Sequence, residues 1–329
     1  MRIKIIGGKL FLLKKHFVPI ISHITFIKIV NILVNQIELL IRSNRLFSKP
    51  VFMKIEPSRE CNLKCPKCIH NRPEIKNEIP KKAYMKKEDF KKVIKPFRNT
   101  LLGISLSGSG EPMLNKNLVS MIRLAHSYNI GVDFPTNFSI KLSDDYLKKL
   151  IFSGLDRIFV SCDGASNSTY VKYRRNGNYD LVLSNVYKLA QLKKQLRKNN
   201  PHIVWKFIVF DHNKHEVKFA INNYKNLGFD SISLEYDALN NNIYDKHRKK
   251  IKNKGSACFW LYSSMDISWD GKVSPCCNRI YSWEIGNAFI SDLNNIWNST
   301  VYMSLRRGFN YFKYGQYLDI QCKRCFNLN

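Results

Sequence analysis

Short apolar runs alternate with amphipathic segments between residue 51 and about residue 235. Six runs are apolar enough to predict β-strands, and the stretches between them, such as 116–128 and 144–154, repeat apolar positions at helical spacing. Six strand–helix alternations predict an α/β fold with parallel strands. Because a closed barrel needs eight, we expect an open, partial (β/α)6 barrel similar to an incomplete TIM barrel. The predicted strands are 51–57, 101–108, 130–137, 156–164, 202–210 and 230–236.

The first fifty residues form a basic, helical extension before this pattern begins. Residues 16–41 are largely apolar, but polar side chains recur among them, so the stretch does not read as a membrane-spanning helix. We expect an amphipathic helix that caps the main domain, and peripheral contact of 16–41 with a membrane surface is the alternative. The interrupting residues are His23, Lys28, Asn31, Asn35, Gln36 and Glu38.

The pattern changes again after a polar linker at 240–255. Residues 256–329 hold five cysteines, short strand-like pieces in "SMDISWDGKVSPCC" and one helical piece at 290–309. We therefore expect three parts: a helical extension (1–50), a barrel core (51–239) and a small Cys-rich α+β module (240–329) that a metal could stabilise.

The chain is strongly basic, with 54 Lys+Arg against 25 Asp+Glu and a formal net charge of +29. Such a charge suits nucleic acid or an anionic membrane. The lysines are spread along the sequence and form no motif with interleaved aromatics, which argues against nucleic acid as the partner. Nine cysteines in CxxxCxxC, CC and CxxC groupings, without a clear secretory signal, indicate a reduced cytoplasmic protein with metal-bound thiolates.

Three of these cysteines, Cys61, Cys65 and Cys68, directly follow the first predicted strand. Three thiolates can hold a [4Fe–4S] cluster and leave one iron open to a substrate or cofactor. The alternatives are a zinc site that borrows a distant ligand such as His70, or three buried thiols. Zinc favours CxxC pairs with four ligands, so the spacing favours iron–sulfur.

Polar residues also gather where the next strands end. "SGSGEP" places Ser109, Gly110 and Glu111 there; its small residues allow close approach of a ligand, and a carboxylate accepts hydrogen bonds from an ammonium group. The alternative is a plain turn with Pro112 in the first helical turn. "PTNFS" adds Asn137, and "SCDG" adds Ser161 and Asp163, each of which is also a common turn residue.

Two further groups follow these strand ends. Arg174 and Arg175 can pair with a carboxylate in the site or remain solvated. His212, His215 and Glu216 read as a loop and a helix start rather than as a metal site.

The motif "CNLKCPKC" resembles the signature of the radical S-adenosylmethionine (radical SAM) enzymes, and "SGSGEP", "TNF" and "SCDG" are similar to that family's Gly-Gly-Glu-Pro, Thr-Asn-Gly and Ser-x-Asp-Gly segments. The resemblance implies that the open iron binds S-adenosylmethionine and that cleavage of this cofactor yields a 5′-deoxyadenosyl radical. Lys67 stands where the family often has an aromatic residue, and Ser109 and Phe138 replace glycines. The residues implied around the cofactor are Ser109, Gly110, Glu111, Asn137 and Ser161, with Asp163 and Arg174 as catalytic candidates.

The C-terminal cysteines resemble those of the SPASM/twitch extension, whose shortened form binds one auxiliary [4Fe–4S] cluster. The resemblance implies Cys258, Cys276, Cys322 and Cys325 as ligands and leaves Cys277 spare. Cys162 lies at a strand end beside apolar neighbours, where we expect it to fill the core.

Radical chemistry of this kind acts on unactivated C–H bonds and needs a low-potential electron donor such as a flavodoxin or ferredoxin. Because the first fifty residues show no β-rich peptide-binding module, we expect a small carbohydrate or cyclitol-like substrate. The alternatives are maturation of a peptide or protein and, from another class, a zinc-stabilised nucleic-acid-binding protein.

Overall fold

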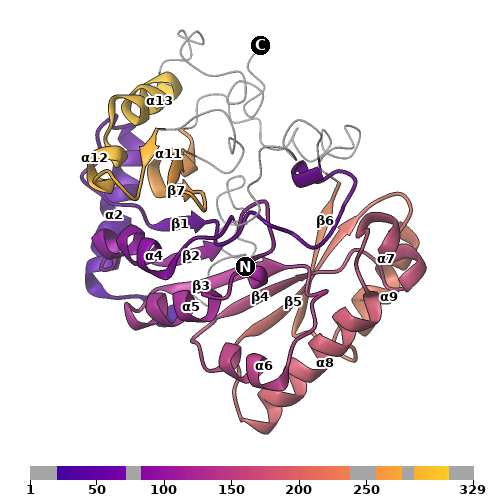
Figure 1. The fold of residues 1–329 in the computed structure, drawn as a ribbon. Helices are drawn as coiled ribbons and strands as arrows, with labels where there is room; N and C mark the ends of the chain where they lie inside the picture. The colour runs from indigo at the N-terminus through magenta and orange to yellow at the C-terminus, as the bar shows by residue number, and fades with distance from the viewer. Residues whose placement is uncertain (1–20, 72–82, 238–256, 276–284, 311–329) are drawn as a thin grey trace, which may run out of the picture.

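The computed structural model describes residues 21–71, 83–237, 257–275 and 285–310. Six strands lie side by side in chain order, all parallel, and each falls within a predicted run. The helices that connect them lie on the outer face of this curved sheet (Figure 1). The predicted partial barrel is confirmed. Its strands are β1 (Phe52–Ile55), β2 (Gly103–Leu106), β3 (Gly131–Thr136), β4 (Arg157–Ser161), β5 (His202–Val209) and β6 (Ser231–Tyr236).

Local side-chain caps fix where several of the connecting helices begin. Ser143, Ser166 and Asn178 each accept a hydrogen bond from a backbone N–H of the following helical turn. They are, in this order, the N-caps of the helices α6, α7 and α8, whose bounds follow. The helices of this part are α4 (Lys87–Ile94), α5 (Leu118–Ser127), α6 (Asp144–Ile151), α7 (Asn167–Tyr173), α8 (Tyr179–Gln195) and α9 (Val217–Asn223).

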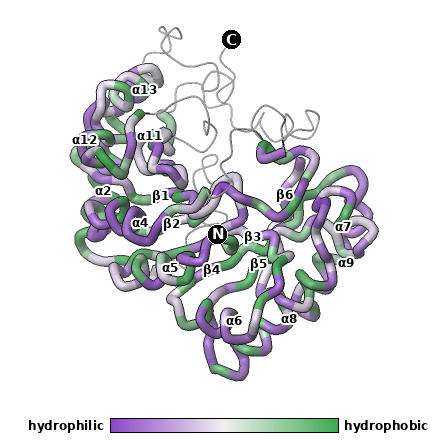
Figure 2. The backbone as a smooth tube through the Cα atoms, viewed as in Figure 1, coloured by the Kyte–Doolittle hydropathy of each residue, from purple (hydrophilic) through white to green (hydrophobic). Residues whose placement is uncertain are grey.

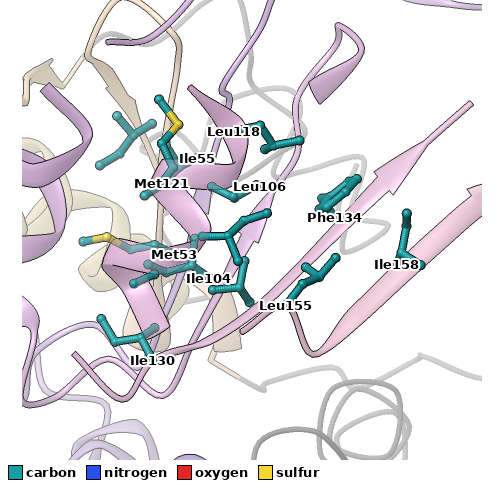
Figure 3. Packing of buried hydrophobic residues seen from close by; sticks show 14 of the residues in the cluster. Met53, Ile55, Ile104, Leu106, Leu118, Met121, Ile130, Phe134, Leu155 and Ile158 are labelled. Carbon is teal, nitrogen blue, oxygen red and sulfur yellow. The ribbon is translucent and has the colours of Figure 1, made fainter. Parts of the chain in front are cut away.

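The core lies between the sheet and these outer helices, along which hydrophobic and hydrophilic positions alternate (Figure 2). Alternate side chains of each strand point towards the helices, while the others point to the inner face of the barrel. Figure 3 shows part of the outer layer, in which strand residues pack against α5. The labelled residues include Met53, Ile55, Ile104, Leu106, Phe134 and Ile158 from the strands, and Leu118 and Met121 from α5.

The C-terminal residues extend the same sheet. β7 (Ser264–Ile267) pairs in parallel with β1, and β8 (Lys272–Ser274) and β9 (Gly286–Asn287) follow in antiparallel pairing, so that the described residues form a sheet of nine strands. Gly271 takes a φ of +87° in the turn between β7 and β8. The boundaries at 50 and 239 stay predictions, and the linker at 240–255 lies outside the described residues.

The single helical piece predicted at 290–309 is instead two helices. α12 (Leu293–Trp297) ends at Asn298, and α13 (Thr300–Asn310) begins two residues later. The Asn298 side chain bonds the backbone of Leu46 through both its oxygen and its nitrogen, which favours a break in the helix there. A short helix, α11 (Phe259–Ser263), precedes β7.

The predicted N-terminal helix is present as α2 (Phe26–Ile41) and caps the start of the barrel. Its N-cap is Thr25. Among the described helices, none is both long enough and apolar enough to cross a bilayer. The face that α2 turns to the protein is its polar face, the reverse of what is usual for an amphipathic helix on a protein surface.

Arg306 of α13 joins the N-terminal and C-terminal segments. Its fully buried guanidinium donates hydrogen bonds to the carbonyl oxygens of Leu261, Trp297 and Asn44 at 2.9 to 3.2 Å. Burial lowers its pKa to about 10, so it stays charged at neutral pH. Because Arg306→Ala removes the guanidinium that donates to the buried carbonyl groups of Leu261 and Trp297, we expect it to cost about 3 kcal/mol of unfolding free energy. Denaturant unfolding measures this loss.

Arg307 provides the matched control, since it is the next residue of the same helix and is exposed. We expect Arg307→Ala to change the unfolding free energy by less than about 0.5 kcal/mol. Equal losses in the two variants would contradict the role assigned to Arg306.

Candidate active site

Cys61, Cys65 and Cys68 lie in the loop that leaves the carboxyl end of β1. The backbone N–H of Cys68 bonds the carbonyl oxygen of Cys65 at 3.1 Å, and that of Lys64 bonds the carbonyl oxygen of Arg175 at 2.9 Å. Among the described residues, no three His, Cys, Asp or Glu side chains converge on one point as ligands of a single metal ion. A cubic cluster makes a different demand, since each thiolate binds a separate iron.

The surroundings of these thiols suit a bound cation. Burial raises the pKa of the Cys61 thiol to about 12, and the nearby Glu111 carboxylate adds to the shift. Burial also raises the pKa of Cys65, although the Arg174 guanidinium opposes the rise. Thiols of this kind become thiolate ligands when a metal supplies the compensating charge. The donor set therefore fits an iron–sulfur cluster.

The end of β2 holds the cysteine loop in place through backbone contact. The N–H of Glu111 bonds the carbonyl oxygen of Glu60 at 2.7 Å. A Cβ on Gly110 would lie 2.3 Å from the carbonyl oxygen of Ser58 and 2.6 Å from that of Glu60. Only glycine allows the two segments to approach this closely, so the "SGSGEP" motif fixes the residues just before Cys61.

The Glu111 carboxylate ties the second strand end to the third. It accepts hydrogen bonds from the Thr136 hydroxyl at 2.7 Å and from the backbone N–H groups of Asn137 and Met113 at 2.7 and 3.1 Å. Burial raises its pKa, and these three bonds oppose the rise. A carboxylate accepts about four bonds, so capacity for one ligand donor is left. That Glu111 receives the cofactor ammonium stays a prediction.

Asn137 continues this connection towards the cysteines. Its side-chain amide donates to the Asn62 side-chain oxygen at 2.8 Å and lies 4.0 Å from Cys61 Sγ, while its oxygen accepts from the Ser139 N–H. Asn62 in turn donates to the Ser139 carbonyl oxygen at 2.9 Å. The sequence pointed to Asn137 but missed Asn62, because an asparagine between two cysteines carries no signal of its own.

Asp163 and Arg174, both predicted from the sequence, form a buried ion pair. Arg174 Nε donates to Asp163 Oδ2 at 2.6 Å, and Arg174 Nη1 lies 4.0 Å from Cys65 Sγ. Asp163 Oδ1 also accepts from the N–H of Ile208. Burial by itself would lower the pKa of Arg174, but Asp163 and Cys65 raise it well above its usual range. A fixed positive charge therefore faces the cysteine loop.

Charged and hydroxyl side chains form a row across the inner face of the barrel, beside apolar ones such as Phe159. Lys54 Nζ lies 3.4 Å from Asp266 Oδ2 between β1 and β7, and Lys206 Nζ lies 3.1 Å from Glu235 Oε2 between β5 and β6. Lys54 of β1 lies in a row of paired positions that crosses the sheet through Ser105 of β2, Asp133 of β3 and Arg157 of β4. The sequence analysis did not identify this row. The available signal was the alternation of apolar and polar residues within strands such as "MKIE" and "RIFVS", which places the polar ones on the face opposite the helices.

The remaining predicted residues fall into three groups. Ser161 is buried at the end of β4 and pairs in register with Lys206. Cys162 is fully buried in the core, as expected. Glu216 accepts hydrogen bonds from the 165–169 segment, including the N–H of Ala165 at 2.7 Å, so the His212–Glu216 stretch is a loop and helix start, as predicted.

Of the auxiliary ligands, only Cys258 can be placed. It is half-buried at the N-cap of α11 and packs against the core. Cys276, Cys277, Cys322 and Cys325 lie outside the described residues.

A partial barrel with three thiols at the carboxyl end of its first strand offers the donors of an iron–sulfur centre. Residues 55–195 match the model of the radical SAM superfamily, and residues 258–326 match that of the SPASM iron–sulfur cluster-binding domain. The chain therefore belongs to the radical SAM superfamily and carries a C-terminal SPASM domain. Its cofactors are S-adenosylmethionine, the [4Fe–4S] cluster that binds it and an auxiliary iron–sulfur cluster.

The chain is also similar in sequence to several curated proteins. A 7,8-dihydro-6-hydroxymethylpterin dimethyltransferase of Methanocaldococcus jannaschii is 33% identical over 132 residues, 39% of this chain and 25% of that protein. A probable GTP 3′,8-cyclase of Saccharolobus islandicus is 31% identical over 192 residues, 57% of this chain and 58% of that protein. The chain thus matches between a quarter and three fifths of these relatives' lengths.

The fold is similar to that of Streptococcus suis SuiB bound to S-adenosylmethionine, with a TM-score of 0.60, 18% identity, and 83% of this chain and 70% of that chain covered. The same protein bound to its precursor peptide SuiA gives a TM-score of 0.60, 17% identity and coverage of 81% and 68%.

Proposed function

We propose that this enzyme abstracts hydrogen from a small polyhydroxylated substrate, of the carbohydrate or cyclitol class, and oxidises or otherwise modifies it. The observation that carries this proposal is the polar inner face, where Lys54 with Asp266 and Lys206 with Glu235 present cations and carboxylates side by side. A hydroxyl group both donates and accepts, so alternating charges can hold several hydroxyls in one orientation. An apolar substrate would displace water from these charged groups without replacing the hydrogen bonds that the water makes.

The residues at the strand ends divide into three roles in this proposal. Cys61, Cys65 and Cys68 would hold the cluster whose open iron binds S-adenosylmethionine, and this group supplies a 5′-deoxyadenosyl radical. Asp163 would hold Arg174 beside the cluster, where a fixed cation favours a reduced, more negative centre. Residues around the cofactor would be Ser109, Gly110, Glu111, Asn137 and Ser161.

The second cluster would be held by Cys258, Cys276, Cys322 and Cys325, and it would accept an electron or orient the substrate. We also propose a flavodoxin or ferredoxin as electron donor, because a formal net charge of +29 attracts acidic one-electron carriers. Free thiols at the described cysteines and such a donor both suit a reducing, cytoplasmic setting.

The test uses the full chain, reconstituted without oxygen and supplied with dithionite, S-adenosylmethionine and a panel of deuterated monosaccharides and cyclitols. We expect about eight irons per chain, and deuterium transferred from one panel member into 5′-deoxyadenosine. Transfer from a peptide and from no panel member would replace the proposed substrate by a peptide. Bound zinc without cofactor cleavage would overturn the enzyme assignment.

A variant pair tests where the substrate lies. Lys206→Met removes a cation of the inner face, and we expect it to raise the KM for the substrate about tenfold with little loss of kcat. Lys149→Met removes an exposed lysine that pairs with Asp145 on α6, and we expect no change in KM. An unchanged KM in both would place the substrate elsewhere.

A further inference from the structure

Helix α2 exposes an almost continuous apolar surface. Of its exposed residues only Gln36 is polar. Leu33 is 58% exposed and Leu40 is 74% exposed, whereas apolar residues of a surface helix normally face the core. We call this surface the α2 apolar face. Its members are Phe26, Ile27, Ile29, Val30, Leu33, Ile37, Leu40 and Ile41.

The buried polar side chains of α2 fix this orientation, because each has a specific hydrogen-bond partner outside the helix. Asn31 bonds both the N–H and the carbonyl oxygen of Lys49. Asn35 donates to the Ser48 hydroxyl at 3.0 Å. Glu38 accepts hydrogen bonds from the N–H groups of Phe47 and Ser48. Turning the helix over would leave all of these groups unpaired, so the apolar face is held outward.

The α2 apolar face points away from the candidate active site. The partners of the polar face lie just before strands begin: Lys49 before β1, Asn129 before β3, and Tyr262 before β7. Parallel strands start at one edge of a sheet and end at the other. The cysteine loop lies at the far edge, where β1 ends. A surface bound to α2 would leave the site open.

The charge around the helix is one-sided. Residues 1–50 hold nine lysines and arginines and a single acid, Glu38, whose carboxylate faces the protein. Arg42 and Arg45 directly follow the helix. Arg98 lies near its start, in a hollow of about 370 Å³ that is also lined by Thr25 and Ile27. Cations therefore border the apolar face at both ends.

We propose that α2 docks the enzyme on an anionic lipid bilayer. The α2 apolar face enters the boundary between headgroups and acyl chains, and the flanking arginines contact the phosphates, as in helices that lie in a membrane interface. A second copy of the chain fits this face less well, because two surfaces of the same positive charge would meet.

Flotation with vesicles tests this proposal. The full chain is mixed with vesicles of phosphatidylcholine alone or with added phosphatidylglycerol. We expect binding to the anionic vesicles that falls about tenfold without phosphatidylglycerol or in high salt. The double variant Leu33→Glu, Leu40→Glu should lose at least about tenfold in binding. Ile221→Glu makes the same change at an exposed position of α9 and should bind as the parent does.

Three results would overturn the proposal. The first is equal binding by the parent and the double variant. The second is no vesicle binding together with a parent dimer, in light scattering, that the double variant loses; this result would make a second copy the occupant. The third is vesicle binding only after deletion of residues 1–20. That result would mean that residues 1–20, and not a lipid bilayer, occupy the α2 apolar face in the full chain. Formation of 5′-deoxyadenosine should be the same in the parent and the double variant, so this test is independent of the proposed function.

Discussion

Cys65→Ala is expected to lower bound iron from about eight to about four per chain and to reduce 5′-deoxyadenosine formation by at least about a thousandfold. The remaining thiols, Cys61 and Cys68, supply two ligands, too few to hold three irons of a cluster. The substitution also removes the sulfur that faces Arg174 at 4.0 Å. Iron analysis after anaerobic reconstitution and chromatography of the nucleoside products measure both losses.

Cys162→Ala is the matched control, because it also removes a buried thiol. The Cys162 side chain is fully buried in the core, and its thiol donates to the Gly164 carbonyl oxygen at 3.5 Å. We expect a loss of about 1 kcal/mol in stability, with iron content and nucleoside formation unchanged. Loss of iron in this control, or full iron in Cys65→Ala, would contradict the assignment of the three loop cysteines.

The barrel was predictable because its strands are buried on the face that packs against the outer helices. That burial imposes apolar runs such as those around Ile104 and Ile158, and these runs have the length of strands. The sequence does not carry the order of pairing at the sheet edge. β7 pairs with β1 across more than two hundred residues, and no local pattern specifies such a partner.

The orientation of α2 was not predictable from the sequence, for a different reason. Helical periodicity shows that one face is apolar, but it does not show which face meets the protein. The decision depends on partners far away in sequence, such as Tyr262, whose carbonyl oxygen accepts a hydrogen bond from Asn35. A helix that buries asparagines is recognisable only when these partners are in place.

The candidate site was located by its motifs, but its internal connections were not. Glu111 was expected to serve a ligand, and it also bonds Thr136 and Asn137. Asp163 and Arg174 were separate candidates, and the structure pairs them. A motif thus marks a strand end, while the contacts between strand ends depend on how the sheet brings them together.

Gly110→Ala is the second change with a large expected effect, because the obstacle is backbone. The added Cβ would lie 2.3 Å from the Ser58 carbonyl oxygen and 2.5 Å from the Arg59 carbonyl carbon. Neither atom can rotate away, so the residues before Cys61 must shift and the hydrogen bond between the Glu111 N–H and the Glu60 carbonyl oxygen must lengthen. We expect a stability loss of about 2 kcal/mol or more and an approximately hundredfold fall in 5′-deoxyadenosine formation.

Gly103→Ala separates this steric effect from the general cost of replacing a strand glycine. A Cβ at Gly103 would meet Phe52 at 3.5 Å, an ordinary contact, so we expect near-parental stability, iron content and product formation. Thermal unfolding, iron analysis and nucleoside analysis of the two variants compare their stability, iron content and product formation. If Gly110→Ala matches Gly103→Ala in stability, iron content and product formation, then the close approach of the segment after β2 to the cysteine loop is dispensable. If Gly110→Ala keeps its stability but loses iron, the glycine acts on the placement of Cys61 itself, because that residue is three positions beyond the obstructing carbonyl group of Ser58.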